Sequence, residues 1–495
     1  MKRQTTRRDF LRDSLKTAAI TGVGYWVLAG QTPKVSASPN ERLAFAGIGI
    51  GGKGAGDIAN AARFADVVAV CDVDKGRLDH AAKKYPKAKA YTDFRKLFEE
   101  QEKSIDAATI STADHTHAPA GLMAMRMKKH VYVQKPLTRT IYEARLMGKV
   151  AQEMGVCTQM GNQGSASDGL RHHAAEMKAG IYGDITEIHV WTNRPIWPQG
   201  PELVRTLKGY EERLKSENVP DAEQKVVEMK SRIERDLNNV EWELWLGPAK
   251  PREYYPGLYH AFAWRGWWDF GTGALGDIAC HSLNKFMAAL DLSSPKSVIA
   301  KTSGHDFDVY PKSSQIEFEY PDTATRKGFK FVWYDGGWFP DRKFLEENGF
   351  KYPEKMPEGG EVIIGTEGVQ GLGRNERKQG VTLPEIRYAP HFPDAEGKPA
   401  EKQHDDPRNM FELITAVKEN NPDLCFSNFP KQAGPLTEAM LLGNLAVWTA
   451  AKANEWGEKI YWDAANMKIT NLAELKTSGV AELIKPVYRE GYVLD

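Results

Sequence analysis

The chain has 495 residues, 41% of them hydrophobic and 27% charged, and its 66 basic residues balance 66 acidic ones. This length exceeds one small domain and predicts two or three structural units. Without residues 1–37 the counts are 59 basic against 64 acidic, a net charge of −5, which argues against a protein built to bind nucleic-acid phosphates. Its four cysteines have no paired spacing, so neither a disulfide framework nor a metal site is predicted.

Residues 1–37 have the layout of a signal peptide: a basic start, a short apolar run at 18–29 and small residues at 35–37. The segment TRRDFLR (6–12) resembles the twin-arginine export consensus, and a basic amphipathic helix is the alternative. No second stretch of roughly 18 apolar residues follows. We therefore expect an exported, periplasmic protein that uses the twin-arginine machinery and is free of the membrane after processing.

From residue 41 to 165, apolar strands alternate with helices, beginning with LAFAGIGIGGKGAGDIANAARF and ADVVAVCDVD. Parallel neighbouring strands need helical crossovers, so this alternation predicts a doubly wound α/β domain with a parallel sheet.

A glycine-rich turn opens this domain. Gly47, Gly49 and Gly52 form GxGxxG between a strand and a helix, and Asp72 ends the second strand about 20 residues later. The pattern is typical of a turn that brings backbone and a helix N-terminus to a dinucleotide pyrophosphate, with the acid on the ribose. An acid there favours NAD over NADP, although Arg77 leaves NADP open. A plain glycine turn beside an ordinary strand-end aspartate is the alternative.

Beyond residue 165 the pattern changes to strands separated by Gly/Pro loops, such as SQIEFEY and GFKFVWY. We expect residues 166–430 to form a substrate-binding α+β domain with an open, mostly antiparallel sheet. Residues 205–237 within it read as a charged, mostly helical surface insertion. Residues 431–495 are expected to be a C-terminal helix and tail.

The segment GALGDIACHSLN places Asp277 and His281 four residues apart. If residues 277–290 form one helix, these two groups share a face with Asn284 and Lys285, while apolar residues pack inward. An N-cap aspartate and an ordinary histidine are the alternative interpretation.

The QKP strand end at 134–136, the Asp277–His281 pair and the glycine-rich opening together resemble the Gfo/Idh/MocA oxidoreductase family, which includes glucose-fructose oxidoreductase and inositol dehydrogenases. The resemblance covers nearly all of the chain after residue 40, and WRGWWDFGTGALGDIACH is similar to exported bacterial members. It implies Lys135, Asp277 and His281 as catalytic residues. The family's motif has a glutamate where this chain has Gln134, so a carboxylate that could tune the lysine is missing.

Two further sets of residues are candidates for binding. For the cofactor they are Gly47, Gly49, Gly51, Gly52, Asp72, Ser111, Thr112, His117, Gln134, Lys135 and Asn162. For the substrate they are Asn193, Arg194, Arg265 and Trp268, with core packing as the alternative for the aromatic side chain.

The resemblance implies an NAD-dependent oxidoreductase that acts on a sugar or polyol by hydride transfer. Export of a folded protein favours tightly held, internally recycled NAD. Two alternatives stay open: an NAD-dependent glycoside hydrolase, for which His117 and His260 are candidates for an extra base, and a non-catalytic NAD-bound sugar-binding protein. A homo-oligomer is expected by analogy with the family.

Overall fold

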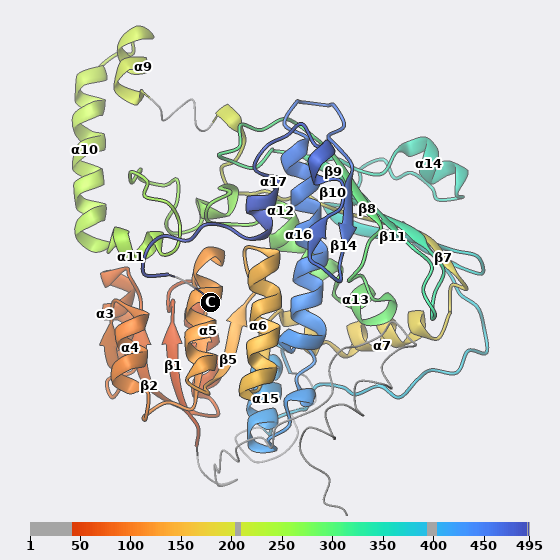
Figure 1. The fold of residues 1–495 in the computed structure, drawn as a ribbon, viewed down its shortest axis with the longest axis horizontal. Helices are drawn as coiled ribbons and strands as arrows, with labels where there is room; N and C mark the ends of the chain where they lie inside the picture. Colours follow the sequence, from red (N-terminus) through yellow and green to blue (C-terminus); the bar gives the residue numbers. More distant parts are fainter. Residues whose placement is uncertain (1–41, 203–208, 394–402, 493, 495) are drawn as a thin grey trace, which may run out of the picture. The chain divides into compact units, whose positions relative to one another are not determined.

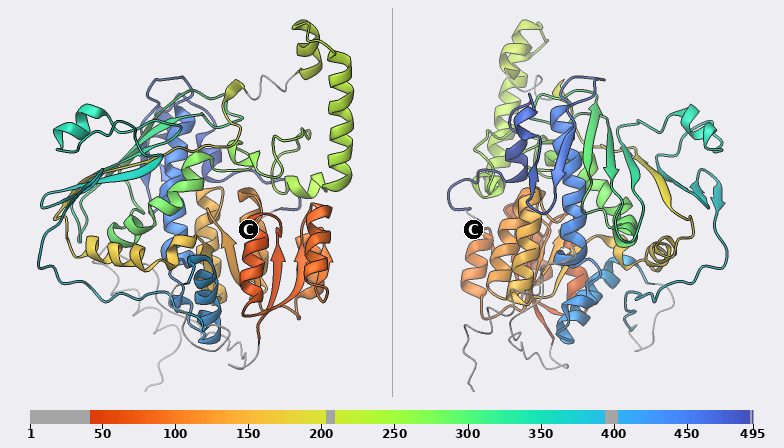
Figure 2. Two further views of the ribbon diagram at one scale, coloured as in Figure 1. Left: turned by 180° about the vertical axis from the view of Figure 1, so that it is seen from behind. Right: turned by 45° about the vertical axis from the view of Figure 1, so that its right-hand side comes forward.

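A computed structural model of the protein describes residues 42–202, 209–393, 403–492 and 494. The predicted export signal at 1–37 lies outside these residues. The described chain forms two β-sheets with helices packed on them (Figures 1 and 2). None of the helices in this part of the chain is both long and apolar enough to cross a bilayer.

The first sheet is parallel throughout, with the strand order β3-β2-β1-β4-β5-β6. Its central strands β4 and β5 are buried along their whole length, which explains their continuous apolar sequence. The structure confirms the predicted doubly wound domain, with the order of a dinucleotide-binding sheet. The strands are β1 (Ala44–Ile48), β2 (Asp66–Cys71), β3 (Lys89–Tyr91), β4 (Ala107–Ile110), β5 (His130–Gln134) and β6 (Thr158–Gly161).

Crossover helices connect these strands. They are α2 (Lys53–Ala62), α3 (Lys75–Lys84), α4 (Phe94–Gln101), α5 (Asp114–Arg126) and α6 (Ile141–Met154). The start of α6 shows why the sequence begins a helix there: Thr140 and Glu143 cap each other's backbone N–H groups. Gly155 then ends the helix in the left-handed conformation that favours glycine.

The second sheet has nine strands in the order β13-β12-β11-β7-β10-β9-β8-β14-β15. Only the β7–β10 pair is parallel, so the predicted mostly antiparallel sheet is confirmed. The strands are β7 (Ile185–Thr192), β8 (Ser297–Thr302), β9 (Ser314–Tyr320), β10 (Phe329–Tyr334), β11 (Gly359–Gly365), β12 (Val369–Gly371), β13 (Arg374–Glu376), β14 (Ile460–Asp463) and β15 (Lys468–Ile469).

The charged insertion of the second half contains two helices, α9 and α10, which lie between residues 209 and 239. The helix expected over 277–290 is divided at Leu283 into two shorter helices. The helices are α7 (Asp168–Lys178), α9 (Tyr210–Ser216), α10 (Ala222–Asn239), α11 (Trp242–Leu246), α12 (Gly273–Ser282), α13 (Asn284–Leu290), α14 (Arg342–Glu347), α15 (Asp405–Lys418), α16 (Gly434–Thr449) and α17 (Val480–Ile484).

Two helices from the C-terminal part of the chain, α15 and α16, pack against the first domain. The apolar face of α15 packs against α2, β5 and β6, so Met410 and Leu413 share a core with Phe45 of the first sheet. The helix α16 contacts α6 of the first domain and β8 and β9 of the second, and β14 beyond it pairs with β8. The helix α16 and the strand β14 are therefore part of the main core.

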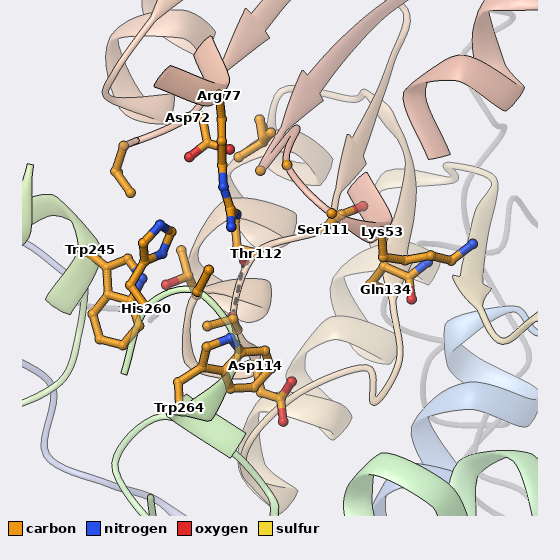
Figure 3. Close-up of a pocket in the computed structure, with 18 of the residues that line it drawn as sticks. Lys53, Asp72, Arg77, Ser111, Thr112, Asp114, Gln134, Trp245, His260 and Trp264 are labelled. Carbon is orange, nitrogen blue, oxygen red and sulfur yellow. Dashed lines mark hydrogen bonds between the residues drawn. The ribbon is translucent and has the colours of Figure 1, made fainter. Parts of the chain in front are cut away.

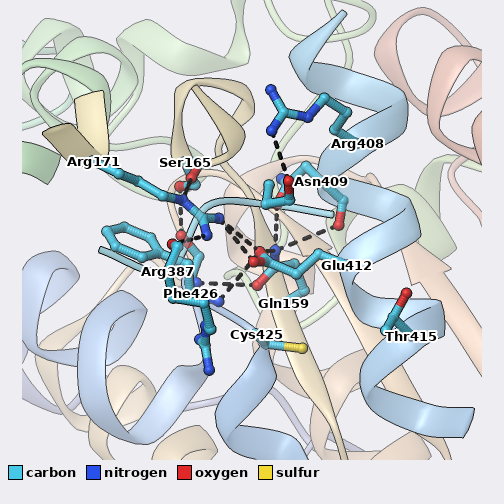
Figure 4. A network of polar contacts seen from close by, with 12 residues as sticks. Gln159, Ser165, Arg171, Arg387, Arg408, Asn409, Glu412, Thr415, Cys425 and Phe426 are labelled. Atoms are coloured by element: carbon cyan, nitrogen blue, oxygen red, sulfur yellow. Dashed lines mark hydrogen bonds and ion pairs between the residues drawn. The ribbon is translucent and has the colours of Figure 1, made fainter. Parts of the chain in front are cut away.

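A buried polar network fixes α15 in place (Figure 4). Arg171 of α7 donates from its terminal nitrogen to both carboxylate oxygens of Glu412, at 2.8 and 3.0 Å. Gln159 of β6 donates to Glu412 at 2.8 Å. Because the charged side chains are only 2% exposed, each one needs the other to stay ionised in the interior.

Candidate active site

The glycine-rich loop between β1 and α2 has an open face. Gly49 has φ +71°, and a Cβ there would lie 2.7 Å from the backbone oxygen of Ser111, so only glycine fits. Gly52 has φ +54° and caps α2, and a Cβ there would meet nothing within 4 Å. The positive φ of Gly52 and the empty space beside it leave the N-terminus of α2 open, so a pyrophosphate could approach the backbone there closely.

The third glycine of such a turn, here Gly52, ordinarily allows the helix to pack closely on the strand, but in this chain Gly54 has that role. A Cβ on Gly54 would lie 1.7 Å from the backbone oxygen of Gly49. The sequence motif alone could not separate these roles, because both glycines fall in the same turn of chain.

Asp72 supports this loop with its buried carboxylate. Its Oδ2 accepts from the Ile50 N–H and its Oδ1 from the Asp74 N–H, both at 3.0 Å. Burial raises the pKa of Asp72. Arg77 lies over Gly51, where a Cβ would come within 2.3 Å of the arginine Cδ. The predicted ribose-binding acid thus lines the site beside a cation.

A cavity of about 470 Å³ extends from this loop (Figure 3). One wall comes from the first domain and the other from residues 244–265 of the second. Nine predicted residues line it: Gly49, Gly51, Gly52, Asp72, Ser111, Thr112, Gln134 and Lys135 from the cofactor set, and Arg265 from the substrate set.

Lys135, at the end of β5, forms an ion pair across the domains. Its Nζ lies 2.7 Å from Asp277 Oδ1 and donates to the Asp277 backbone oxygen at 2.8 Å. Arg265 Nε reaches the same Oδ1 at 3.3 Å. Burial acts to raise the pKa of Asp277, but Lys135 and Arg265 outweigh it and hold that pKa below its ordinary value. The result is an ionised carboxylate between two cations.

His281 follows Asp277 by one turn of α12 and lines a second hollow, of about 370 Å³. Burial and the nearby Lys135 lower the pKa of His281 to about 4. Its ring is therefore neutral at pH 7, which leaves a nitrogen able to accept a proton. His173, Lys285 and Glu361 share this hollow, and Lys285 is ion-paired with Glu361.

Asn284 does not lie on the helix face that it was predicted to share with Asp277 and His281. The break at Leu283 turns Asn284 into the interior, where it donates to Ser165 Oγ at 2.9 Å. The sequence pattern assumed one continuous helix and could not show this break.

His117 and Asn162, predicted to bind the cofactor, do not line the large cavity. His117 is buried with its ring nitrogens 2.9 Å from Pro136 O and 3.1 Å from Thr112 O, so it ties α5 to the turn after Lys135. Asn162 is buried and donates to Cys280 O at 2.5 Å. These two side chains hold the loops of the site together rather than facing the cavity.

The other predicted substrate residues also make contacts elsewhere. Trp268 stacks on Tyr310 with ring centroids 3.7 Å apart, which is the core-packing alternative. Asn193 donates to Glu358 at 2.7 Å and accepts from Arg194 at 2.7 Å. Neither Asn193 nor Arg194 lines the large cavity or the hollow around His281.

Gly47, the first glycine of the motif, is packed rather than exposed to the cavity. A Cβ on it would lie 2.9 Å from Ile50 Cγ2 and 3.0 Å from Ile58 Cγ1. The residue serves the tight turn that the sequence predicts for it.

Asp114 is a functional candidate that the motifs did not single out. It lines the cavity in the first turn of α5 and accepts from Thr272 Oγ1 at 2.8 Å. Burial raises the pKa of Asp114 to about 7, against the opposing effect of Arg265 and Lys135. The available signal was its place after β4, because ligands of such sheets bind outside the carboxyl ends of the strands.

A second unforeseen carboxylate, Asp57 of α2, lies beside Gln134. Its Oδ2 accepts from Gln134 Nε2 and from Ser111 Oγ, both at 2.8 Å, and its Oδ1 lies 3.1 Å from Lys53 Nζ. A carboxylate from α2 is thus hydrogen-bonded to Gln134, the residue that stands where the family's motif has a glutamate.

The strand order, the open glycine turn and the strand-end acid define a two-domain protein whose first domain binds NAD. The family model described as "Oxidoreductase family, NAD-binding Rossmann fold" matches residues 42–162, and that described as "Oxidoreductase family, C-terminal alpha/beta domain" matches residues 224–328. These two stretches of the chain are thus similar to the two domains of the Gfo/Idh/MocA oxidoreductases.

Curated relatives match parts of the chain. It is 31% identical to an inositol 2-dehydrogenase of Salmonella paratyphi B over 20% of this chain and 29% of the relative. It is 29% identical to a glycosyl hydrolase family 109 protein of Solibacter usitatus over 37% of this chain and 44% of the relative. The chain spans less than half the length of these relatives.

Solved structures share the fold over most of the chain. The WlbA dehydrogenase of Bordetella pertussis, crystallised with NADH and UDP-GlcNAcA, has a TM-score of 0.51 at 15% identity, covering 86% of this chain and all of that one. A levoglucosan dehydrogenase, in complex with NADH and levoglucosan, has a TM-score of 0.50 at 17% identity, covering 84% and 99%. At such low identity these likenesses show the fold.

Proposed function

We propose that the protein is an NAD-dependent oxidoreductase acting on a secondary alcohol of a sugar or polyol. The observation that carries this proposal is the Lys135–Asp277 ion pair, at 2.7 Å, on the border of a cavity that begins at the glycine-rich loop. The inositol and levoglucosan dehydrogenases among the similar proteins support a polyhydroxylated substrate.

Three residues of this chain have distinct parts in the proposed chemistry. When bound, NAD supplies the acceptor and donor of hydride. The ammonium group of Lys135 stabilises negative charge that develops on the substrate oxygen. Asp277 orients that ammonium group, since it accepts from Nζ on both its side chain and its backbone. His281, neutral above pH of about 4, accepts the hydroxyl proton.

The hollow around His281 suits a hydroxylated substrate. His173, Lys285 and Glu361 present both donors and acceptors to it. On the other side of Asp277, Arg265 lies 4.2 Å from the ring centroid of Trp264 and 4.7 Å from that of Phe262. The two rings hold the guanidinium of Arg265 beside Asp277.

A redox-neutral glycosidase is the second candidate, and Asp114 favours it. In such a cycle an oxidised sugar loses a carbon-bound proton and expels its aglycone, after which water adds and the sugar is reduced again. The elimination needs one more acid/base group than alcohol oxidation does. His117 is hydrogen-bonded to backbone oxygens, and His260 lines the cavity but lies 2.8 Å from Asp74. Asp114 lines the same cavity, and burial raises its pKa to about 7.

One screen separates the two candidates. The full chain with NAD is mixed with inositols, free hexoses and chromogenic hexosides, and both reduced nicotinamide and released aglycone are measured. Net reduction of NAD by an alcohol establishes the dehydrogenase. Aglycone release that requires NAD but accumulates no NADH establishes the glycosidase. If neither signal appears with any compound while NAD stays bound, the non-catalytic sugar-binding alternative replaces both.

We further propose that residues 1–37 direct export of the folded protein, with NAD bound in the cytoplasm and carried out in place. The twin-arginine pattern at 6–12 supports this, since that route is read from such a pattern. We expect the double variant Arg7→Lys/Arg8→Lys to stay in the cytoplasm, which cell fractionation measures.

The expectation of a homo-oligomer is tested by light scattering of the purified protein.

A further inference from the structure

We propose that residues 238–265 of the second domain, called the clasp below, are part of the cofactor site, where they hold the adenosine half of the dinucleotide and set its rate of release. The inference rests on NAD as the cofactor of the proposed function. It adds a set of cofactor-binding residues, His260 and Trp245 first among them, that lie outside the glycine-rich fold.

The backbone of the clasp is fastened to the loop that follows β2. The Glu241 N–H donates to Val73 O at 2.9 Å, and Asp74 and Val240 form an antiparallel bridge. Lys75 Nζ donates to Asn238 O at 3.1 Å. The clasp is thus joined to the chain immediately after Asp72, the acid that is predicted to bind the ribose.

Side chains strengthen this joint around Asp74. His260 Nε2 lies 2.8 Å from Asp74 Oδ2, and Asn239 Nδ2 donates to Asp74 Oδ1 at 2.9 Å. The Gly76 N–H in turn donates to Asn239 Oδ1 at 3.2 Å. Burial acts to raise the pKa of Asp74, but the hydrogen bonds from His260 and Asn239 outweigh it and lower that pKa. The carboxylate at the centre of the joint is therefore ionised.

A second attachment joins the clasp to α5. His115 Nε2 lies 3.0 Å from Trp245 O, and the two rings have centroids 5.3 Å apart. Gly247 approaches Thr116, where a Cβ would be 3.1 Å from the threonine Oγ1. The clasp is thus attached to the first domain at residues 238–241, at Trp245 and Gly247, and at His260.

The inner side of the clasp faces the cavity where the ribose-binding acid lies. His260 and Trp245 line it together with Asp72 and Arg77 (Figure 3). The ring of Trp245 meets that of His260 edge to face, with centroids 6.5 Å apart. An aromatic and an imidazole wall beside a ribose-binding acid suits a planar base with its sugar, which is the adenosine half.

Release of bound NAD tests the proposal. The full-length chain is loaded with NAD, freed of excess cofactor by gel filtration and diluted into excess ADP-ribose, and the remaining bound NAD is measured over time. We expect His260→Ala to speed release at least tenfold, and His260→Gln, which keeps a donor for Asp74, to recover part of the difference. His80→Ala on the exposed side of α3 is the matched control and should release NAD as the wild type does.

A competition experiment locates the effect on the dinucleotide. The affinity of ADP-ribose should fall in His260→Ala, whereas that of nicotinamide mononucleotide should stay unchanged. Equal NAD release from His260→Ala and wild type, with both folded by circular dichroism, would overturn the clasp and leave the proposed function standing. If neither protein binds NAD, the cofactor assignment beneath both proposals is wrong.

Discussion

His281 combines a reactive group with an environment that keeps it neutral. Burial and Lys135 lower the pKa of its imidazole to about 4, and it lines a hollow apart from the large cavity. Removing the ring should therefore impair proton transfer without disturbing the cofactor. We expect His281→Gln to lower kcat by about 10²–10⁴-fold while NAD affinity stays unchanged.

The measurement is steady-state turnover together with NAD binding by titration. His172→Gln, an exposed change on α7, serves as the control and should leave both quantities at the wild-type level. Wild-type turnover in His281→Gln would remove this residue from the mechanism.

Asp114 gives a prediction for stability against pH. The folded protein holds its proton up to pH of about 7, whereas an unfolded chain releases it near pH ~3.9. Between those values the folded state binds more protons, so this residue makes the free energy of unfolding fall as the pH rises, by up to ~4 kcal/mol. Asp114→Asn should remove that fall.

Urea unfolding without added NAD, at pH of about 5 and about 8, measures the effect. We expect the variant to gain stability relative to the wild type at the higher pH, because the cost of ionising Asp114 in the interior is gone. If the free energies of unfolding of wild type and variant differ by the same amount at both pH values, Asp114 is not protonated in the folded protein.

At the scale of elements, α15 depends on one buried ion pair. Arg171 and Glu412 are each 2% exposed, and removing one partner leaves the other charge unpaired in the interior. We expect Glu412→Ala to lower the free energy of unfolding by about 3–5 kcal/mol. Glu419→Ala, at the exposed end of the same helix, should change it by less than ~0.5 kcal/mol. Equal unfolding midpoints for the two variants would contradict this account of the network.

The elements that the sequence predicts well are those with a local cause. Alternating strands and helices predicted the parallel sheet. Lys135 and Asp277, which meet at 2.7 Å, were instead implied by the family resemblance of the short motifs that contain them. The break at Leu283 and the packing of α15 on the first sheet depend on contacts between distant segments. No local pattern carries that information.

The contrast between local patterns and long-range contacts also explains which site residues the sequence predicted correctly. His117, Asn162 and Trp268 have side chains that fit a polar or aromatic site, but their partners come from elsewhere in the fold and hold them inside. Asp57 and Asp114 become chemically interesting only because the fold buries them beside other charged groups. Burial of this kind is a property of the folded chain.

At the scale of the whole molecule, the site is assembled from both halves. The first domain contributes the glycine-rich loop and Lys135, and the second contributes Asp277, Arg265 and the clasp. A cofactor held between the two halves would suit the proposal that the protein is exported with its nucleotide in place and regenerates it during turnover. Such a protein needs no nucleotide from its surroundings.

The central claim is that the cofactor accepts hydride from a sugar alcohol beside Lys135. The direct measurement is the absorbance of reduced nicotinamide in a single turnover, after NAD-loaded protein is mixed with an alcohol substrate found in the screen. The account predicts that the band appears in the wild type and in Lys83→Met, an exposed control, and forms about 10²–10³-fold more slowly in Lys135→Met with NAD still bound. A band that forms equally fast without Lys135 would contradict it.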